Sequence, residues 1–245
     1  EIRLSLVGSE MCIRDRFKKV VIHFIKQGGI EELSISGGEP FLHPDLFEMV
    51  KFSKENGIKT VIFTSGVKRA FEMQVEMIEY IKDKCKQDLQ EIEDHEPWNE
   101  RLKRNVKGYY DKLLVPKSFE GITRQDFERL KQLGLDKIVF DWQAFEETID
   151  NELMGRKGLI TCLMDSLIRA SKTGLNVDAH FIPMKPNYRQ FTDIIECLEM
   201  SKVKNISILN FVPQGRGREN KEELMLNEEE LKEFSEILRK GKEHY

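Results

Sequence analysis

The sequence predicts an α/β protein built around a parallel sheet. Strand-like segments begin near residues 33, 60, 137, 177 and 205, and a helical pattern follows each of them. The last segment is expected to run from Asn205 to Val212. This alternation is typical of parallel sheets with right-handed crossovers. The run Val61-Ile62-Phe63 is almost continuously apolar, as in strands that are buried on both faces. With 245 residues, one domain with a sizeable core is the default expectation.

Composition narrows the class of protein further. Hydrophobic residues make up 40% and charged residues 33%, which indicates a globular chain. A net charge of −4 gives no overall attraction to nucleic acid or to anionic membranes. No apolar run approaches the ~18 residues that a membrane span needs, and no pattern of a secretion signal is present.

The four cysteines are scattered, which suits a reducing compartment. None is close enough to another to form a short metal-binding motif. They are Cys12, Cys85, Cys162 and Cys197. We therefore expect a cytoplasmic protein without a nucleic-acid or membrane partner.

The most informative stretch runs from Leu33 to Pro44. A short alternating strand pattern is followed by two glycines, which allow a sharp turn and the close approach of a ligand. A carboxylate stands at the strand end, and a proline then ends the ladder. Because α/β proteins bind ligands at the carboxyl ends of parallel strands, we expect a site here, although an ordinary strand-to-helix turn would use the same glycines. The candidate residues are Gly37, Gly38, Glu39 and Pro40.

Two strand-end motifs resemble those of radical S-adenosylmethionine (SAM) enzymes. The string Ile35-Ser-Gly-Gly-Glu-Pro-Phe-Leu-His-Pro-Asp45 resembles the second-strand motif, whose backbone and Glu hold the methionine amino group of the cofactor in that family. The string Phe211-Val-Pro-Gln-Gly-Arg-Gly217 resembles the sixth strand end of the enzymes that modify peptides or mature cofactors. The two motifs are more than 170 residues apart, and both follow expected strands.

The resemblance implies a partial (β/α)6 TIM-like barrel over residues 17–217, with its first strand missing or damaged. It also implies SAM and a 4Fe-4S cluster as cofactors. Reductive cleavage of SAM would give a 5′-deoxyadenosyl radical that abstracts hydrogen from an unknown substrate. The Gln-Gly-Arg-Gly ending suggests a peptide as the substrate class, and the reaction needs an electron donor protein.

The resemblance also supplies cofactor-binding candidates beyond the first loop. Thr64 and Ser65 would line the pocket, with Ser65 in place of the commoner Asn. Asp141 would replace the polar residue that holds the methionine carboxylate; the match is loose here, because Phe140 stands where Ser is usual. Met154 likewise stands where Arg is usual, so Arg156 and Lys157 are further substitutes. The remaining candidates are Asn187, expected to cap a helix, and Phe211 and Val212, expected against the adenine.

The first sixteen residues resemble a read-through of sequencing adapter, and we expect a non-native leader ahead of a helix from Phe17 to Gln27. The alternative is a native first strand, Ile2 to Val7. The family places its three cluster cysteines shortly before this helix, where the sequence has only Cys12. We therefore expect that the chain as written cannot perform the reaction.

Two further segments flank or interrupt the expected barrel. Residues 68–118 are expected to be a helical insertion after the family's third strand, with a long amphipathic helix from Phe71 to Ile92 that ends before Pro97. A basic-aromatic segment, Arg101–Tyr110, follows; it is a solvated helix face or, less often, a nucleic-acid patch. Residues 218–245 are expected to form a C-terminal helix, and the chain stops without a cysteine-rich extension.

Two other functions fit parts of the pattern. One is a degenerate barrel that keeps a nucleoside pocket but has lost catalysis. The other is an unrelated α/β enzyme that cradles a phosphate with the backbone of Gly215-Arg-Gly217.

Overall fold

The computed structural model describes residues 10–70, 75–96, 99–114 and 119–244. The chain divides into two compact units. The first contains residues 1–69 and 121–245, and the second contains residues 70–120. The boundaries of the second unit lie two residues from those of the insertion expected at 68–118.

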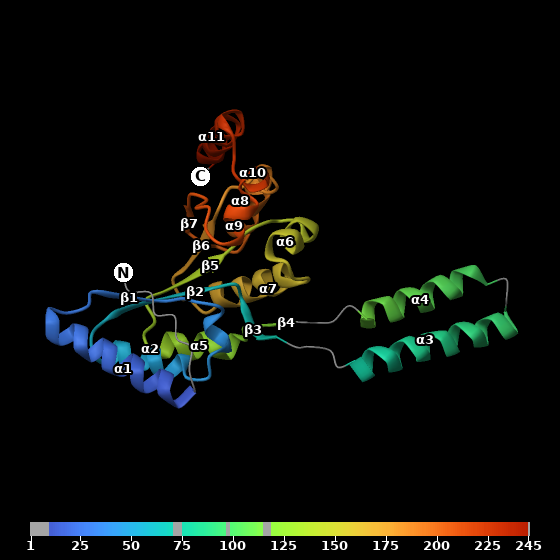
Figure 1. Cartoon of the computed structure of the whole chain (residues 1–245), viewed down its shortest axis with the longest axis horizontal. Helices are drawn as coiled ribbons and strands as arrows, with labels where there is room; N and C mark the ends of the chain where they lie inside the picture. The colour runs from blue at the N-terminus through green and yellow to red at the C-terminus, as the bar shows by residue number, and fades with distance from the viewer. Residues whose placement is uncertain (1–9, 71–74, 97–98, 115–118, 245) are drawn as a thin grey trace. The chain divides into compact units, whose positions relative to one another are not determined.

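The first unit is built on a parallel sheet of five strands in the order β1-β2-β5-β6-β7 (Figure 1). Every neighbouring pair is parallel, so all five carboxyl ends lie along one edge, here called the carboxyl edge. The predicted parallel α/β class is thus confirmed, whereas the expected first strand, Ile2–Val7, lies outside the described residues. The strands are β1 (Glu32–Ile35), β2 (Lys59–Thr64), β5 (Lys137–Asp141), β6 (Val177–Phe181) and β7 (Asn205–Ile208).

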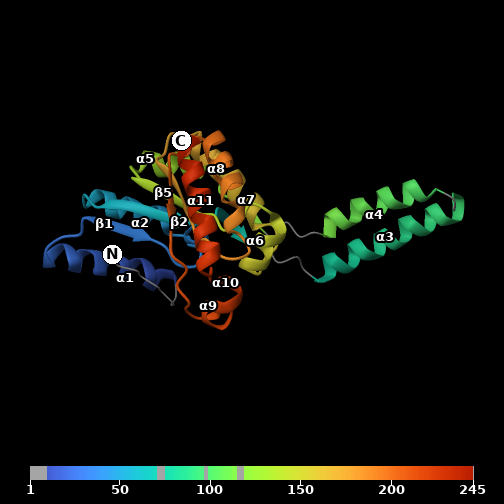
Figure 2. The same ribbon diagram turned by 90° about the horizontal axis from the view of Figure 1, so that it is seen from above.

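Helices connect and cover these strands (Figures 1 and 2). They are α1 (Glu10–Gln27), α2 (Leu46–Glu55), α5 (Arg124–Gln132), α6 (Glu147–Met154), α7 (Leu159–Ser171), α8 (Phe191–Met200), α9 (Arg216–Glu219), α10 (Lys221–Leu224) and α11 (Glu228–His244). Short 3-10 helices span Pro40–Leu42 and Tyr188–Gln190. Within the described residues, no helix combines the length and apolar character that crossing a membrane requires.

The register separates the two faces of the sheet. Ile62 lies beside Ile138, and Phe140 lies beside Ala179, all fully buried in the main core with residues of the helices. The opposite face is more polar, because alternate residues of a strand point to opposite sides. On this polar face, Asp141, His180 and Ser207 lie side by side on the adjacent strands β5, β6 and β7, close to the carboxyl edge.

Local signals explain where several helices begin. Thr123 caps α5: its hydroxyl accepts from the Asp126 N–H, and the Asp126 carboxylate accepts from the Thr123 N–H. Helix α1 begins at Glu10 instead of the expected Phe17. The apolar residues Phe17 and Val21 pack with Leu33 of β1 in a second cluster.

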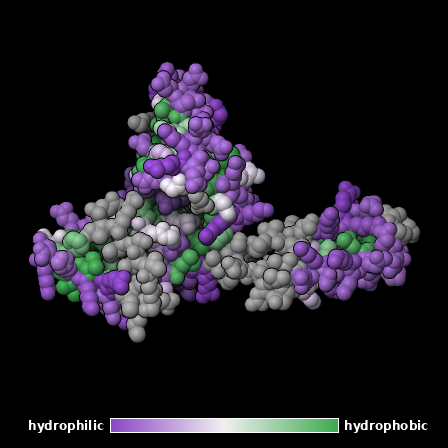
Figure 3. Space-filling model, viewed as in Figure 1, coloured by the Kyte–Doolittle hydropathy of each residue, from purple (hydrophilic) through white to green (hydrophobic). Residues whose placement is uncertain are grey.

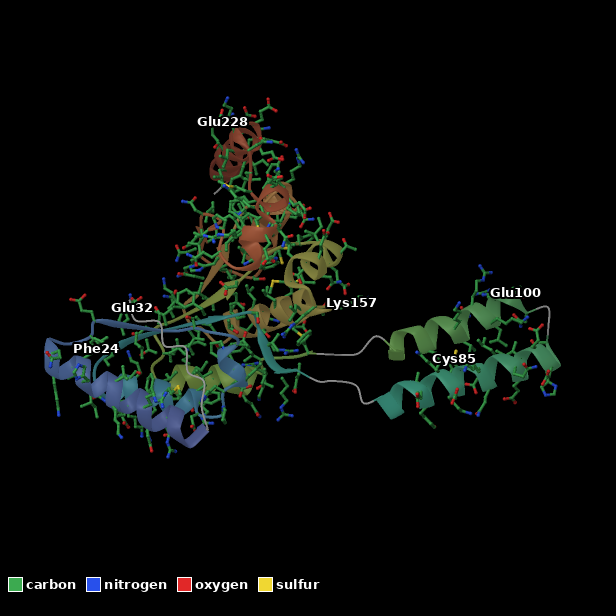
Figure 4. The ribbon with its side chains drawn as sticks, in the orientation of Figure 1. Phe24, Glu32, Cys85, Glu100, Lys157 and Glu228 are labelled. Atoms are coloured by element: carbon green, nitrogen blue, oxygen red, sulfur yellow. The ribbon has the colours of Figure 1, made fainter. Side chains whose placement is uncertain are left out.

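The second unit contains two helices that lie side by side, α3 (Val75–His95) and α4 (Glu100–Leu114). Lys103 of α4 pairs with Glu93 of α3, and the Tyr110 hydroxyl bonds to Asp88. Figure 4 labels Cys85 on α3 and Glu100 at the start of α4. These contacts join an acidic helix to a more basic one.

A strand precedes the expected long helix of the insertion. Residues Val67–Ala70 form the strand β3, which pairs with β4 (Phe119–Gly121), and helix α3 is described from Val75 to His95. Phe71 and Pro97 lie outside the described residues. The strand was not predicted, because Lys68 and Arg69 are polar neighbours and interrupt the alternation of apolar and polar residues that indicates a strand.

The last strand is also shorter than expected. We predicted a strand from Asn205 to Val212, but β7 ends at Ile208, and the N–H of Leu209 then bonds to the Phe181 carbonyl. Phe211 and Val212 therefore lie in the loop after the strand, where Pro213 has no N–H for a ladder.

Candidate functional site

The glycine loop after β1 leaves its backbone uncovered. Gly37 has a φ of +142°, a conformation that side chains rarely adopt. A Cβ placed on Gly37 or on Gly38 would meet no described heavy atom within 4 Å. A ligand can therefore approach this backbone closely.

The carboxylate of Glu39 joins the ends of β1 and β2. Its Oε1 accepts from the Thr64 hydroxyl at 2.7 Å and from the Phe41 N–H at 3.2 Å. Its Oε2 accepts from the Ser65 N–H at 2.8 Å and from the Ser65 hydroxyl at 2.6 Å. These bonds use the roughly four acceptor sites of a carboxylate. Glu39 therefore holds the shape of the rim through protein contacts.

Burial raises the pKa of Glu39, and the hydrogen bonds from Ser65, Thr64 and Phe41 oppose that rise.

The part of this rim that follows β2 is tightly packed. Gly66 has a φ of +83°, and a Cβ there would come within 2.7 Å of the Leu163 Cα. Its N–H donates to the Thr64 hydroxyl oxygen at 3.0 Å. Thr64 and Ser65 are thus fixed from both sides.

Asp141 ends the central strand and carries a carboxylate without a lysine or arginine partner among the described ion pairs. Its Oδ1 lies 3.8 Å from Nδ1 of His180. Partial burial, and then the charge of Glu39, raise the pKa of Asp141 to about 6. Burial lowers the pKa of His180, whose ring lies 5.2 Å from that of Phe63. The two carboxylates make the described part of the carboxyl edge electronegative.

Gln143 belongs to this edge, although the sequence did not single it out. Its Oε1 is buried and has no hydrogen-bond partner among the described residues. A buried acceptor in this state is costly unless a ligand or water supplies a donor. The only available signal was its position two residues after Asp141.

Asn187 occupies the N-cap position of the 3-10 helix Tyr188–Gln190, as expected, but its side chain makes no capping hydrogen bond there. The residue is fully buried. Its Oδ1 accepts from the Met184 N–H at 2.7 Å, and its Nδ2 donates to the carbonyls of Gln143 and Ile182. Asn187 therefore fixes the backbone of two strand-end loops.

The loop after β7 contains the other motif. A Cβ on Gly217 would lie 3.2 Å from the ring of Phe211, so the glycine allows that ring to pack against the loop. Val212 is 63% exposed. The N–H groups of Gly217 and Arg218 already bond to the carbonyls of Gln214 and Gly215. The turn therefore lacks these two donors for a phosphate, which disfavours the phosphate-binding alternative.

The structure thus brings one group of predicted residues together. Direct hydrogen bonds join Glu39 with Thr64 and Ser65, and electrostatic coupling links Asp141 to Glu39. Pro40, buried, begins the 3-10 helix that follows Glu39. Phe211, Val212 and Asn187 follow other strands of the same sheet. Arg156 and Lys157 lie in the turn between α6 and α7.

The described residues do not fit an iron–sulfur cluster. Such clusters need several cysteine thiolates close together. Cys85, Cys162 and Cys197 lie on three different helices, α3, α7 and α8. No group of three His, Cys, Asp or Glu side chains in the described ranges is arranged to hold a metal ion.

No family model matches the chain. It is 23% identical over 199 residues to the Fe-coproporphyrin III synthase of Methanosarcina barkeri (strain Fusaro / DSM 804), an alignment that covers 81% of this chain and 36% of that protein. The chain thus spans about a third of the length of this curated relative.

Solved structures share the fold. Coproporphyrinogen III oxidase (HemN) from Escherichia coli, described as a radical SAM enzyme, aligns with a TM-score of 0.56 at 12% identity over 97% of this chain and 48% of that one. The structure of TYW1 with a lysine-pyruvate adduct aligns with a TM-score of 0.52 at 14% identity over 98% of this chain and 65% of that one. The chain thus shares its fold with HemN and TYW1 and is similar in sequence to Fe-coproporphyrin III synthase.

Proposed function

We propose that this chain is the SAM-binding core of a radical SAM enzyme, and that SAM binds at the carboxyl edge beside β1, β2 and β5. One observation carries the proposal. The Glu39 carboxylate fixes the ends of β1 and β2 while the backbone of Gly37 and Gly38 stays open to a ligand.

The charges at this edge suit a cationic ligand. SAM carries a sulfonium and an ammonium group, and the Asp141 carboxylate has no lysine or arginine partner among the described ion pairs. An opposite charge nearby favours the ionised carboxylate. The resemblance assigns Asp141 to the methionine carboxylate, but two anions repel each other. We therefore assign Asp141 to the positive part of SAM or to its hydroxyl groups.

Gln143 complements this assignment. Its buried Oε1 needs a donor, and SAM offers N–H and O–H donors on its adenine, ribose and ammonium groups. In this proposal Glu39 is a positioning residue, because its own acceptor sites are filled by the protein. Phe211 and Val212 remain candidates for the adenine side.

In radical SAM enzymes, cleaved SAM supplies a 5′-deoxyadenosyl radical that abstracts hydrogen. The described residues do not fit the cluster that this cleavage needs, so no cleavage step is assigned to them. The electron donor protein, the peptide substrate and the cytoplasmic location are likewise proposals that rest on the sequence.

Isothermal titration calorimetry with SAM, S-adenosylhomocysteine and adenosine tests the binding proposal. We expect saturable one-site binding of SAM that is tighter than that of S-adenosylhomocysteine, which lacks the sulfonium charge. Equal binding of adenosine and SAM would support the nucleoside-binding module instead. The absence of SAM binding at millimolar concentration would refute the proposal.

A further inference from the structure

A second cavity lies away from the carboxyl-edge site, between β7, α8 and α11. Its volume is about 590 Å³, within the range of ligand-binding sites. The walls are mainly apolar, with Phe191, Ile195 and Leu198 from α8 and its start, and Ile206 and Ile208 from β7. We call this cavity the β7 groove. Figure 3 shows hydrophobic residues next to the mainly hydrophilic surface of α11.

The strand beside the groove is an edge of the sheet. β7 pairs with β6 on one side, and no described strand pairs with its other side. Edge strands are commonly protected by proline, by inward-pointing charges or by a covering element. Residues Asn205–Ile208 contain no proline and no charge, and Ile208 and Leu209 are each 39% exposed. The edge is therefore suited to pairing with another extended segment.

The charges around the groove restrict what that segment can carry. Lys204 and Arg239 line it, and none of its lining residues is acidic. Both cationic residues are exposed. A partner with acidic side chains at the ends of an apolar stretch complements this pattern in both respects.

We propose that β7 binds an extended peptide segment of another protein by strand addition. Main-chain hydrogen bonds to the open edge would supply affinity, and alternate side chains would enter the β7 groove. Ile206 and Ile208 would contact apolar side chains, and Lys204 and Arg239 would contact flanking carboxylates. With a rise of about 3.3 Å per residue, the four residues of β7 span about 13 Å, so about five to seven peptide residues suffice.

A designed probe makes this testable without knowledge of the natural partner. The probe is a fluorescently labelled peptide, acetyl-Glu-Ser-Val-Ser-Leu-Ser-Glu-amide, whose alternate residues present an apolar pair between two acids. Fluorescence anisotropy with the full chain should show saturable binding. Two further versions of the peptide are each N-methylated at the backbone nitrogens along one of its two edges, which removes the donors of that edge. The version whose methylated edge faces β7 should bind at least about tenfold more weakly than the parent peptide.

A charge exchange provides the matched control. The double variant Lys204→Glu/Arg239→Glu should bind the Glu probe at least about tenfold more weakly and should prefer the same peptide with Lys at both ends. Unchanged circular dichroism would show that the variant is folded. Both residues are exposed, so the fold does not depend on them for burial.

Three outcomes would overturn the proposal. They are no binding at millimolar peptide, equal binding of both methylated versions and the parent, or indifference to the charge exchange. Sedimentation of the chain alone checks a fourth: a dimer abolished by Ile208→Asp would mean that a second copy occupies β7. None of these results depends on SAM binding at the carboxyl edge.

Discussion

Glu39 and Ser65 are 26 residues apart in the sequence, and one oxygen of the Glu39 carboxylate accepts both the N–H and the hydroxyl of Ser65, at 2.8 and 2.6 Å. This pair of hydrogen bonds joins the loop after β1 to the loop after β2. It also explains how a carboxyl with a raised pKa is kept in place at the carboxyl edge. The rim of the proposed SAM site depends on this contact.

Replacing Glu39 with Gln should destabilise the chain by about 2 kcal/mol. The amide group of Gln would turn a donor toward donors, and the Ser65 N–H cannot reverse its role. Urea unfolding of the variant measures the loss. The matched control is Glu32→Gln, whose ion pair with Lys59 is exposed, and it should change stability little. Equal stability of the two variants would contradict the role given to Glu39.

SAM binding should weaken as the pH falls through about 6, because Asp141 then takes up a proton and loses its charge. Calorimetry at pH 5, 6, 7 and 8 measures this change. The variant Asp141→Asn should bind SAM more weakly at pH 7 and should lose most of the pH dependence. An unchanged pH profile in the variant would exclude Asp141 as its source.

The same group should affect folding with a defined sign. Its pKa in the folded chain, about 6, is above its ordinary value of 3.8, so the folded chain holds the proton more tightly. The stabilisation is full below pH 3.8 and is lost as the pH rises through about 6. The difference in unfolding free energy between Asp141→Asn and wild type should therefore grow in favour of the variant across this window. A constant difference would contradict the assignment.

Two glycines with similar backbone angles should respond differently to alanine. Gly57→Ala places a side chain at φ +73° with no described atom within 4 Å, so only backbone strain of about 1 kcal/mol is expected. Gly66→Ala adds a clash with the Leu163 backbone and should cost about 3 to 4 kcal/mol. Urea unfolding of both variants compares them. Equal losses would show that the packing of Gly66 is looser than described.

Anaerobic reconstitution with iron and sulfide should leave the chain colourless. The described cysteines lie on separate helices, and Cys12 alone precedes Phe17. Visible absorbance spectroscopy, with iron and sulfide analysis, measures the outcome. A stoichiometric brown cluster that persists in the variant Cys12→Ser would refute this prediction.

Much of the fold could be predicted because its signals are local. The strand that ends at Ile35, the apolar run Val61–Phe63 and the capping pair Thr123 and Asp126 each show their structure within a few residues. The turn of Gly37 and the terminal carboxylate of Glu39 are equally local.

The rest depended on contacts between distant residues. The bonds from Thr64 and Ser65 to Glu39 follow from the pairing of β1 with β2. The strand Val67–Ala70 exists because it pairs with β4, about fifty residues later. An unpartnered amide such as Gln143 becomes visible only when its surroundings are known. Spacing alone does not report such relationships.

The most direct test of the central claim is SAM binding to the variant Gly38→Val. A Cβ at Gly38 meets no described atom within 4 Å, and its φ is not in the left-handed region, so the variant should keep the melting temperature of the wild type. The new side chain would occupy the space over the backbone where we place SAM. We predict at least about a tenfold loss of affinity in calorimetry, equivalent to 1.4 kcal/mol. SAM binding by the folded variant with wild-type affinity would contradict the account.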